Sequence, residues 1–275
     1  MPELPEVETI ARNLRRGTDG ASSLIGQTIL SARLLWPRTL AEPDMETFQA
    51  LLPGQSVQDI GRRAKFLTIT LSESILVFHL RMSGDLRMEP SESPLEKHDR
   101  MVLDFTSGWR LSFNDTRKFG RVWLVYDTLA IFAALGPEPD DPALTPAKFH
   151  EMLRERKRAI KPLLLDQHFL AGLGNIYTDE ALFRASIHPL QSSETLDEQD
   201  AARLLEAIRF TLASGIESNG ASIDWVYRGG DFQNHFQVYQ RSGKPCPRCG
   251  QPINKILVGQ RGTHFCPNCQ KLKGA

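Results

Sequence analysis

Four cysteines near the C-terminal end constrain the fold of this chain more than any other feature of its sequence. They form two Cys-x2-Cys pairs separated by 16 residues: Cys246, Cys249, Cys266 and Cys269. Each pair can place two thiolates at one corner of a tetrahedral site, and two pairs at this spacing are typical of a four-cysteine zinc ribbon. We therefore predict one structural Zn2+ in a closed, all-thiolate site. His264 is surplus to this set, and we expect it on the surface or facing a phosphate.

The composition is that of an ordinary globular chain, with 275 residues, 41% hydrophobic and 24% charged. This length allows two domains. No apolar run approaches the roughly 18 residues that span a membrane. The N-terminus is acidic, which is unlike a secretory signal, and cysteines confined to one pattern favour a metal site in a reducing compartment. We expect a monomer without a membrane partner in the cytosol.

The formal net charge is zero, but the charges are unevenly distributed. From Asp231 to Ala275 there are seven Lys or Arg residues against one Asp, a net charge of +6. The stretch from Arg154 to Lys161 is also basic, whereas Glu138 to Asp141 is acidic. Basic faces on a neutral protein can bind a phosphate backbone. A solubilising tail or a solvated helix face explains any one of these runs equally well.

The order of patterns predicts an α+β multidomain protein. Residues Pro5 to Arg16 show helical periodicity and are followed by a stop at Gly17. From about Ile25 to Tyr126, short apolar runs broken by turn residues predict an antiparallel β-sandwich. Leu135 to Pro146 contains four prolines and is the best candidate for a linker. The expected domains are a sandwich with its leading helix (1–134), a linker (135–147), a helical domain with a mobile loop (148–234) and a zinc finger (235–275).

Within the helical part we predict helices over Pro146 to Arg158, Lys161 to Leu170, Ile176 to Ala185 and Thr195 to Ser218. A capping box of Thr195 and Glu198 opens the last of these, and Asn219-Gly220 closes it. The stretch from Asn219 to Asn234 is rich in Gly, Ser and polar residues, which indicates a mobile loop.

The N-terminal residues indicate unusual chemistry. If Met1 is removed, Pro2 becomes a secondary amine with the carboxylate of Glu3 beside it. Such an amine condenses with the anomeric carbon of a sugar to a cationic iminium, an electron sink that permits elimination. Glu3 then suits a general acid at the ring oxygen, although a carboxylate stabilised by the helix dipole is an equally good interpretation. Together with the basic C-terminus, this end suggests an enzyme that attacks DNA covalently.

Several expected turns pair basic and apolar side chains. Met82, Arg117 and Phe119 on neighbouring hairpin tips could wedge into a base stack and fill the hole left by an extruded nucleotide. Taken singly, each is more often a core or surface residue. The stretch from Gly172 to Tyr177 can grip a phosphate with the backbone N–H groups of a helix start, or can be a plain connection between helices.

Taken jointly, these segments resemble the formamidopyrimidine-DNA glycosylases. The matching stretches run from residue 2 to residue 270 in the family's order: PELPEVET, RRAKF, HLRMSG, KHDR, DTRKFG, LGPEP, AIKPLLLDQ, GNIY and QRGTHFCPNCQ. The resemblance implies an N-terminal β-sandwich, a helix–two-turn–helix module and a C-terminal zinc finger. It also implies a bifunctional glycosylase and AP lyase of base-excision repair, which excises oxidised purines from duplex DNA and cuts by β,δ-elimination.

The resemblance further implies a role for each matching residue. Catalytic roles fall on Pro2 as the Schiff-base nucleophile, Glu3 as the acid, Glu6 as a supporting carboxylate and Lys65 at the active-site phosphates. DNA-binding roles fall on Met82, Arg117 and Phe119 in the space left by the everted base, and on Lys161, Asn175 and Arg261 at phosphates. Residues 217–234 would cover the everted purine.

The chain departs from the family pattern at Arg81, where some members have glycine, at Lys118, where a second arginine is common, and in the 217–234 loop. The exact lesion preference therefore stays open. Two alternatives remain: the sister group that acts on oxidised pyrimidines, and a non-catalytic zinc-ribbon DNA-binding protein with no need of a free Pro2.

Overall fold

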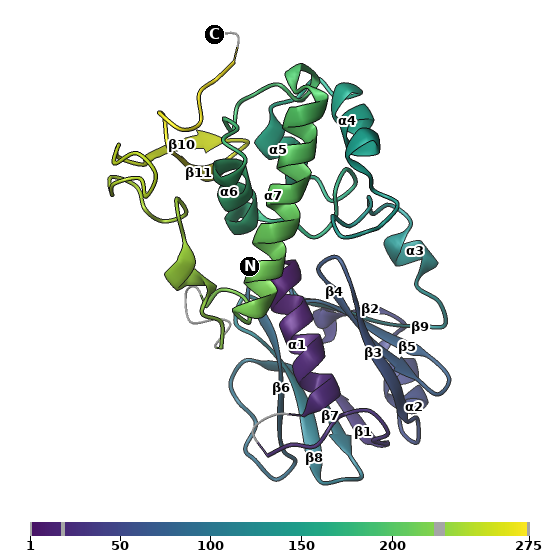
Figure 1. Ribbon diagram of the computed structural model, residues 1–275. Coiled ribbons are helices and arrows are strands. Elements are labelled where there is room, and N and C mark those ends of the chain that lie inside the picture. Colours follow the sequence, from purple (N-terminus) through teal and green to yellow (C-terminus); the bar gives the residue numbers. More distant parts are fainter. Residues whose placement is uncertain (1, 18–19, 223–228, 274–275) are drawn as a thin grey trace. The chain divides into compact units, whose positions relative to one another are not determined.

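The computed structural model describes residues 2–17, 20–222 and 229–273. These residues divide into two compact units (Figure 1). The sandwich unit contains the chain up to Ala133, together with Ser222 and Gly229, and the helical unit contains Ala134–Ala221 and the chain from Gly230 onward. Within the described ranges, no helix is long and apolar enough to cross a membrane.

The sandwich unit begins with the expected amphipathic helix, α1 (Leu4–Arg16). Its apolar face, which includes Val7, Ile10 and Leu14, is buried against the sheets. Gly17 ends the helix with a φ of 79°, and a Cβ at this position would lie 2.3 Å from the carbonyl oxygen of Ala21. Only glycine fits such a close approach in this backbone conformation, which explains the sharp stop.

Two sheets form the sandwich (Figure 1). One is four-stranded in the order β1-β7-β8-β6, and the other is five-stranded in the order β2-β9-β5-β4-β3. The strands are β1 (Ile29–Leu34), β2 (Leu40–Glu42), β3 (Val57–Arg63), β4 (Phe66–Leu71), β5 (Ile75–His79), β6 (Gly84–Pro90), β7 (Asp99–Phe105), β8 (Trp109–Asp115) and β9 (Arg121–Val125). Short helices α2 (Met45–Leu51) and α3 (Leu129–Phe132) complete the unit.

The predicted sandwich is confirmed, with one difference in strand direction. The short edge strand β2 pairs with β9 in parallel, whereas every other described pairing in the two sheets is antiparallel. Most of the unit's strands lie between β2 and β9 in the sequence, so no hairpin forces these two to run in opposite directions. In β4 the burial alternates residue by residue, which places Leu67, Ile69 and Leu71 in the core.

The helical unit contains α4 (Pro146–Arg154), α5 (Ile160–Leu164), α6 (Asn175–Arg184) and α7 (Glu198–Glu217). Two of them are shorter than predicted: α4 stops before Arg158, and α5 stops well before Leu170. The predicted capping box of Thr195 and Glu198 is replaced by Asp197, whose carboxylate accepts a hydrogen bond from the Asp200 amide at 2.7 Å. Thr195 lies in a preceding 3-10 turn (Ser193–Thr195), so the helix begins three residues later than expected.

The proline-rich stretch expected as a linker is bound to the helical unit. The Arg209 side chain of α7 donates to the carbonyl oxygens of Pro139 at 2.6 Å and Leu144 at 2.8 Å. A Cβ on Gly136 would lie 2.6 Å from the carbonyl oxygen of Phe169, so this stretch packs closely against the chain that follows α5. It is therefore ordered by side-chain-to-backbone bonds that proline content does not reveal.

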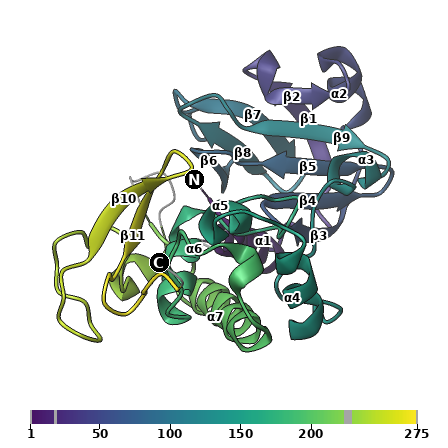
Figure 2. The same cartoon turned by 90° about the horizontal axis from the view of Figure 1, so that it is seen from above.

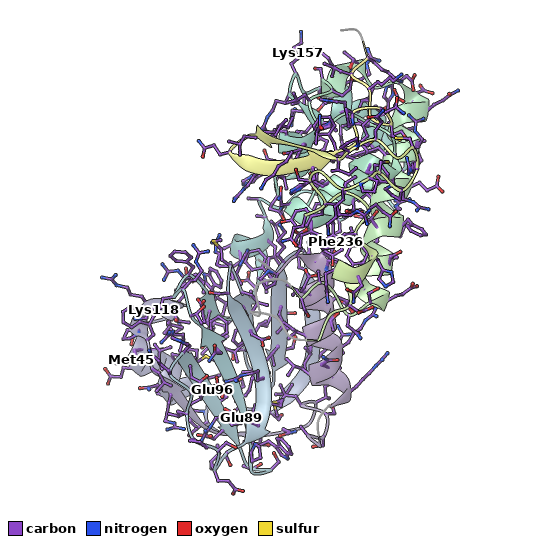
Figure 3. All side chains as sticks on the ribbon, turned by 90° about the vertical axis from the view of Figure 1, so that its left-hand side faces the viewer. Met45, Glu89, Glu96, Lys118, Lys157 and Phe236 are labelled. Carbon is purple, nitrogen blue, oxygen red and sulfur yellow. The ribbon has the colours of Figure 1, made fainter. Side chains whose placement is uncertain are left out.

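A β-hairpin, β10 (Asn254–Val258) and β11 (Arg261–Phe265), ends the helical unit. Gly259 and Gln260 form its two-residue turn, both with positive φ (54° and 61°), as a type I′ turn requires. Helix α6 contacts both α7 and β11, and Figures 1 and 2 show the three elements close together. Between α7 and the hairpin, a 3-10 turn (Phe232–His235) is followed by Phe236, whose buried side chain is labelled in Figure 3.

Candidate functional site

The start of α1 gathers the residues predicted to act on a sugar. Pro2 is buried, and Glu3 and Glu6 are each 2% exposed. The Glu6 carboxylate accepts a hydrogen bond from the Glu3 amide at 2.7 Å, which fixes the backbone that follows Pro2. Met1 lies outside the described residues. The structure therefore brings one ring nitrogen and two buried carboxylates to a single helix start, where the helix dipole favours negative charge.

The turn between β3 and β4 carries Lys65, which is 5% exposed. Its backbone is shaped by Ala64 in the left-handed region, with a φ of 53°. Glu8 joins α1 to this hairpin by accepting from the Arg62 side chain at 3.1 Å. This bond joins α1 to the hairpin that carries Lys65, and the Glu8 contact was not predicted from the sequence.

A neighbouring histidine, His79, was not predicted as a site residue. Burial, followed by the charges of Arg81 and Lys65, lowers the pKa of His79 to about 3. Its Nδ1 accepts a hydrogen bond from the Arg81 amide at 3.0 Å, so the proton of the neutral ring belongs on Nε2. The neutral ring thus lies in the electrostatic field of two cations, Arg81 and Lys65, and only the tertiary fold reveals this environment.

The three residues predicted to probe the base stack lie on two adjacent turns. Met82 is 37% exposed between β5 and β6, and Phe119 is 51% exposed between β8 and β9. The guanidinium of Arg117 lies 5.1 Å from the centre of the Phe119 ring. Because Gly84 at the start of β6 pairs with Asp115 at the end of β8, both turns lie at one end of the same sheet.

Two of the three departures from the family pattern, Arg81 and Lys118, fall on these turns. Arg81 and Lys118 adopt positive φ values of 55° and 60°. Lys118 points away from the sheet, with its amine 3.8 Å from the centre of the Trp36 ring (Figure 3). This cation–π contact holds the exposed amine at the tip of the second turn.

In the helical unit, Lys161 forms a buried ion pair. The side chain is fully buried, and its Nζ contacts the Asp179 carboxylate at 2.6 Å and the carbonyl oxygen of Gly262 at 3.1 Å. The Asn175 amide donates to the same Gly262 oxygen at 3.0 Å. Lys161 and Asn175 therefore hold the backbone beside Arg261, whose own side chain is exposed.

The surface position predicted for His264 is wrong, while its predicted place facing a phosphate stays a prediction. His264 is 6% exposed, and its amide donates to the Asp179 carboxylate at 2.8 Å. The reason is that β11 packs against α6, which turns this residue inward. One carboxylate thus joins α5, α6 and β11.

Glu180 was also missed by the sequence analysis. Its carboxylate accepts from three successive amides, Gln237 at 2.9 Å, Val238 at 3.0 Å and Tyr239 at 2.8 Å. Burial nevertheless raises the pKa of Glu180. The chain that returns from the predicted 217–234 loop is anchored by these bonds, while residues 223–228 lie outside the described part of the chain.

A polar cavity of about 420 Å3 lies beside Asn175. Tyr239, Lys255 and Gly262 line it as well. Lys255 is exposed, and a Cβ on Gly262 would lie 3.3 Å from its Cε, so the lysine stem lies over the turn that carries Arg261. The helical unit therefore concentrates basic and amide groups around one end of the hairpin.

The four cysteines meet at one point. Their sulfur atoms all lie within 4.8 Å of one another, with Cys246–Cys269 at 3.9 Å and Cys249–Cys266 at 3.5 Å. A tetrahedral Zn2+ with bonds of about 2.3 Å requires sulfur atoms about 3.8 Å apart. Backbone amides of Arg248 and Cys269 donate to the sulfur atoms of Cys246 and Cys266, both at 3.4 Å. The cluster fits one structural Zn2+, as predicted.

The pKa values of the thiols also indicate that the site binds a cation. Hydrogen bonds from the Asn268 side chain and the Gln251 amide lower the pKa of Cys249 to about 6. Burial, followed by the neighbouring thiols, raises the pKa of Cys269 to about 12. Four thiolates this close repel one another, and a bound divalent cation removes that repulsion because it stabilises the deprotonated thiols.

Comparisons with known proteins match this architecture along nearly the whole chain. Family models match as the formamidopyrimidine-DNA glycosylase N-terminal domain over residues 1–122, its H2TH domain over 135–226 and a zinc finger found in FPG and IleRS over 243–272. The fold and the site thus define a DNA glycosylase with a helix–two-turn–helix module and a zinc finger. The chain belongs to the formamidopyrimidine-DNA glycosylase family, the glycosylase and AP lyase enzymes of DNA repair.

Relatives and solved structures agree. The formamidopyrimidine-DNA glycosylase of Chloroflexus aggregans is 49% identical over 99% of both chains, and that of Enterococcus faecalis is 42% identical over 100% of this chain and 99% of its own. A structure of MutM with DNA containing carbocyclic 8-oxo-G has a TM-score of 0.90 at 38% identity, covering 98% of this chain and 100% of its own. The Lactococcus lactis enzyme bound to AP-site DNA has a TM-score of 0.90 at 39% identity with the same coverage.

Proposed function

We propose that this enzyme excises oxidised purines, 8-oxoguanine and formamidopyrimidines, from duplex DNA and cuts the strand at the resulting site. The observation that carries the proposal is the burial of Pro2 at the start of α1 beside Glu3 and Glu6. The DNA complexes named for MutM and for the Lactococcus lactis enzyme support the substrate class.

In the proposed mechanism the nitrogen of Pro2, freed by removal of Met1, attacks the anomeric carbon of the damaged nucleoside. The bond to the base breaks, and the base departs with the bonding electrons and a proton. Glu3 protonates the ring oxygen as the sugar opens, which leaves an iminium between Pro2 and C1′. The iminium acidifies the C2′ proton, so loss of that proton expels the 3′-phosphate. A second elimination expels the 5′-phosphate. Glu6 keeps the Glu3 backbone in place through its hydrogen bond.

Each unit is proposed to bring its own DNA-binding residues. In the sandwich unit, Lys65 binds phosphates near the reacting sugar, and Met82, Arg117 and Phe119 fill the space left by the everted nucleotide. In the helical unit, Asn175 and Arg261 bind phosphates. We propose that Lys161 acts on phosphates only indirectly, through the backbone at Gly262, because its amine is buried in an ion pair.

The first test is borohydride trapping on duplex DNA with one 8-oxoguanine opposite cytosine. Wild-type protein whose intact mass shows that Met1 is absent should form a covalent adduct. Pro2→Gly, which replaces the secondary amine by a primary one, should lower the yield of doubly eliminated product by about tenfold or more, since nucleophilic catalysis depends on that amine. DNA binding should stay within about twofold of wild type, because phosphate contacts dominate affinity.

The remaining alternatives give different results. Trapping only on thymine-glycol DNA would assign the protein to the oxidised-pyrimidine group. A non-catalytic zinc-ribbon protein would be favoured by two results together. Zinc-loaded protein that lacks Met1 would form no adduct on either substrate, and Pro2→Gly would bind DNA as tightly as wild type. Salt-dependent binding is expected of every alternative and does not separate them.

A further inference from the structure

The two turns that carry Met82, Arg117 and Phe119 share one buried carboxylate. Asp115, the last residue of β8, is 1% exposed. Its Oδ1 accepts a hydrogen bond from the Ser83 hydroxyl and another from the Arg117 amide at 3.1 Å. Its Oδ2 accepts from the Gly120 amide at 2.7 Å. A single side chain therefore binds two amides of the second turn, those of Arg117 and Gly120, and the Ser83 hydroxyl of the first turn.

Ser83 completes this connection between the turns. It follows Met82 directly, is 3% exposed, and its hydroxyl oxygen also accepts from the Arg117 amide at 3.0 Å. The Arg117 N–H is thus shared between Ser83 and Asp115, so the backbone of the second turn is bonded directly to the first. These contacts lie beside the Gly84–Asp115 pair that already aligns β6 with β8.

The surroundings leave this cluster little room to move. A Cβ on Gly84 would lie 2.6 Å from the Leu80 carbonyl oxygen, and one on Gly120 would lie 2.4 Å from the Phe113 ring. The Asp115 backbone is fixed as well, because its carbonyl oxygen accepts from the Arg100 side chain at 2.7 Å. The exposed side chains of both turns therefore stand on a rigid, buried base.

We propose that Asp115 and Ser83 are positioning residues, which lock the two turns together so that Met82, Arg117 and Phe119 enter the base stack as one rigid wedge. The inference rests on the proposed function. Neither residue needs to touch the DNA. Their effect is to fix the spacing of the three side chains before binding, so that no ordering of the turns is required when a nucleotide is extruded.

The proposal predicts a difference between two substrates. A duplex with 8-oxoguanine opposite cytosine requires extrusion of a stacked base, whereas a duplex with an abasic site has no base to extrude. Asp115→Asn replaces the two acceptors of a carboxylate by one and so loosens the turns. We expect this variant to slow single-turnover cleavage at 8-oxoguanine by about 10- to 100-fold, since misplacement of about 1 Å has effects of this size. Cleavage at the abasic site should stay within about twofold of wild type.

Ser83→Ala is the second variant, because it removes only one hydroxyl and is expected to fold even if Asp115→Asn does not. It should show the same substrate difference with a smaller loss at 8-oxoguanine, about three- to tenfold. Asp99→Asn is the matched control. Asp99 is 3% exposed in the adjacent strand β7 and accepts from the Glu96 amide at 2.7 Å, the Asn114 side chain at 2.9 Å and the Arg87 side chain at 3.1 Å. These three described partners all lie outside the two turns. It should slow both substrates equally or not at all.

Three outcomes decide the matter. Selective loss at 8-oxoguanine in Asp115→Asn or Ser83→Ala, together with weaker fluorescence of a 2-aminopurine placed beside the lesion, supports the positioning role. Equal loss on both substrates, or no loss in a folded variant, overturns it and leaves Asp115 a residue of general stability. Failure of the wild-type enzyme on both substrates would instead contradict the proposed function itself.

Discussion

His79 illustrates, at the scale of one residue, how burial fixes a charge state. The ordinary pKa of histidine is 6.5, and burial, with the charges of Arg81 and Lys65, lowers that of His79 to about 3. The folded protein therefore keeps this ring neutral at pH values where the unfolded chain binds a proton. Its contribution to stability is fully present above pH 6.5 and is lost as the pH falls from 6.5 toward 3.

We therefore expect the free energy of unfolding of the wild type to fall by about 1 kcal/mol more than that of His79→Gln between pH 7 and pH 5.5. Glutamine cannot titrate, so the variant lacks this part of the pH dependence. Urea unfolding followed by tryptophan fluorescence at a series of pH values measures the difference. Parallel pH profiles for the two proteins would show that His79 titrates normally.

The residues whose positions could be predicted from the sequence are those that depend only on the spacing of nearby residues. The cysteine pairs are of this kind, and so are Met82 and Phe119, which fall on expected hairpin tips. Lys161 and His264 could not be placed in this way. Lys161 meets Gly262 across 101 positions of the chain, and His264 meets Asp179 across 85. Only the packing of β11 against α6 creates those partners.

At the scale of the secondary-structure elements, Asp179 joins α5, α6 and β11 through a fully buried ion pair with Lys161. Removing one partner of such a pair leaves an uncompensated buried charge. We expect Asp179→Asn to lower the free energy of unfolding of the helical unit by about 3–5 kcal/mol. The double variant Lys161→Met/Asp179→Leu should recover much of this loss, since neither buried charge remains.

The control for this prediction is an exposed pair on the same unit. Lys157 lies 3.7 Å from Glu194 with its side chain 83% exposed (Figure 3). Lys157→Met should change the stability by less than about 0.5 kcal/mol. Denaturant unfolding followed by far-UV circular dichroism compares the three variants. An Asp179→Asn protein as stable as Lys157→Met would show that Lys161 is neutral or hydrated in the fold.

The elements themselves were predicted unevenly, for a physical reason. The strands of the sandwich follow period-two apolar runs, and α1 has both a clear apolar face and a glycine stop. The starts of α4 and α7 depend instead on side-chain caps, Thr145 and Asp197, whereas α5 has no side-chain cap at its start. Thr195 and Glu198 match the capping-box pattern, but the carboxylate of Asp197, two residues after Thr195, caps the helix instead.

At the scale of the whole molecule, each of the two units has its own cluster of buried hydrophobic residues. One buried cluster runs through α1 and the two sheets, from Val7 to Leu124. Another joins Phe183 of α6 to Val238, Ile253 and two of the zinc-site cysteines. The zinc site therefore belongs to the packing of the helical unit, while the sandwich has an apolar core to which no cysteine contributes.

This division predicts what loss of zinc does. Cys249→Ser removes one thiolate, and because metal binding supplies folding free energy to such sites, β10 and β11 should lose their order. Since β11 also carries Arg261 and the Asp179 contacts, the affinity for DNA should fall by about 100-fold or more, as expected when several phosphate contacts are lost together. Hydrogen exchange read by mass spectrometry should show lost protection in the hairpin and α6, and unchanged protection in β4, β5 and β8.

Lys244→Gln, a change of an exposed residue beside the same ribbon, is the control, and it should keep zinc, protection and most of the affinity. Wild-type protein treated with a chelator should reproduce Cys249→Ser if metal loss is the cause. Loss of protection throughout the sandwich after either treatment would mean that its core depends on the ribbon, contrary to the separate buried clusters. Retained protection in β10 and β11 without metal would mean that packing of the ribbon against Phe183 is sufficient to keep the two strands ordered. The zinc would then act in DNA binding rather than in folding.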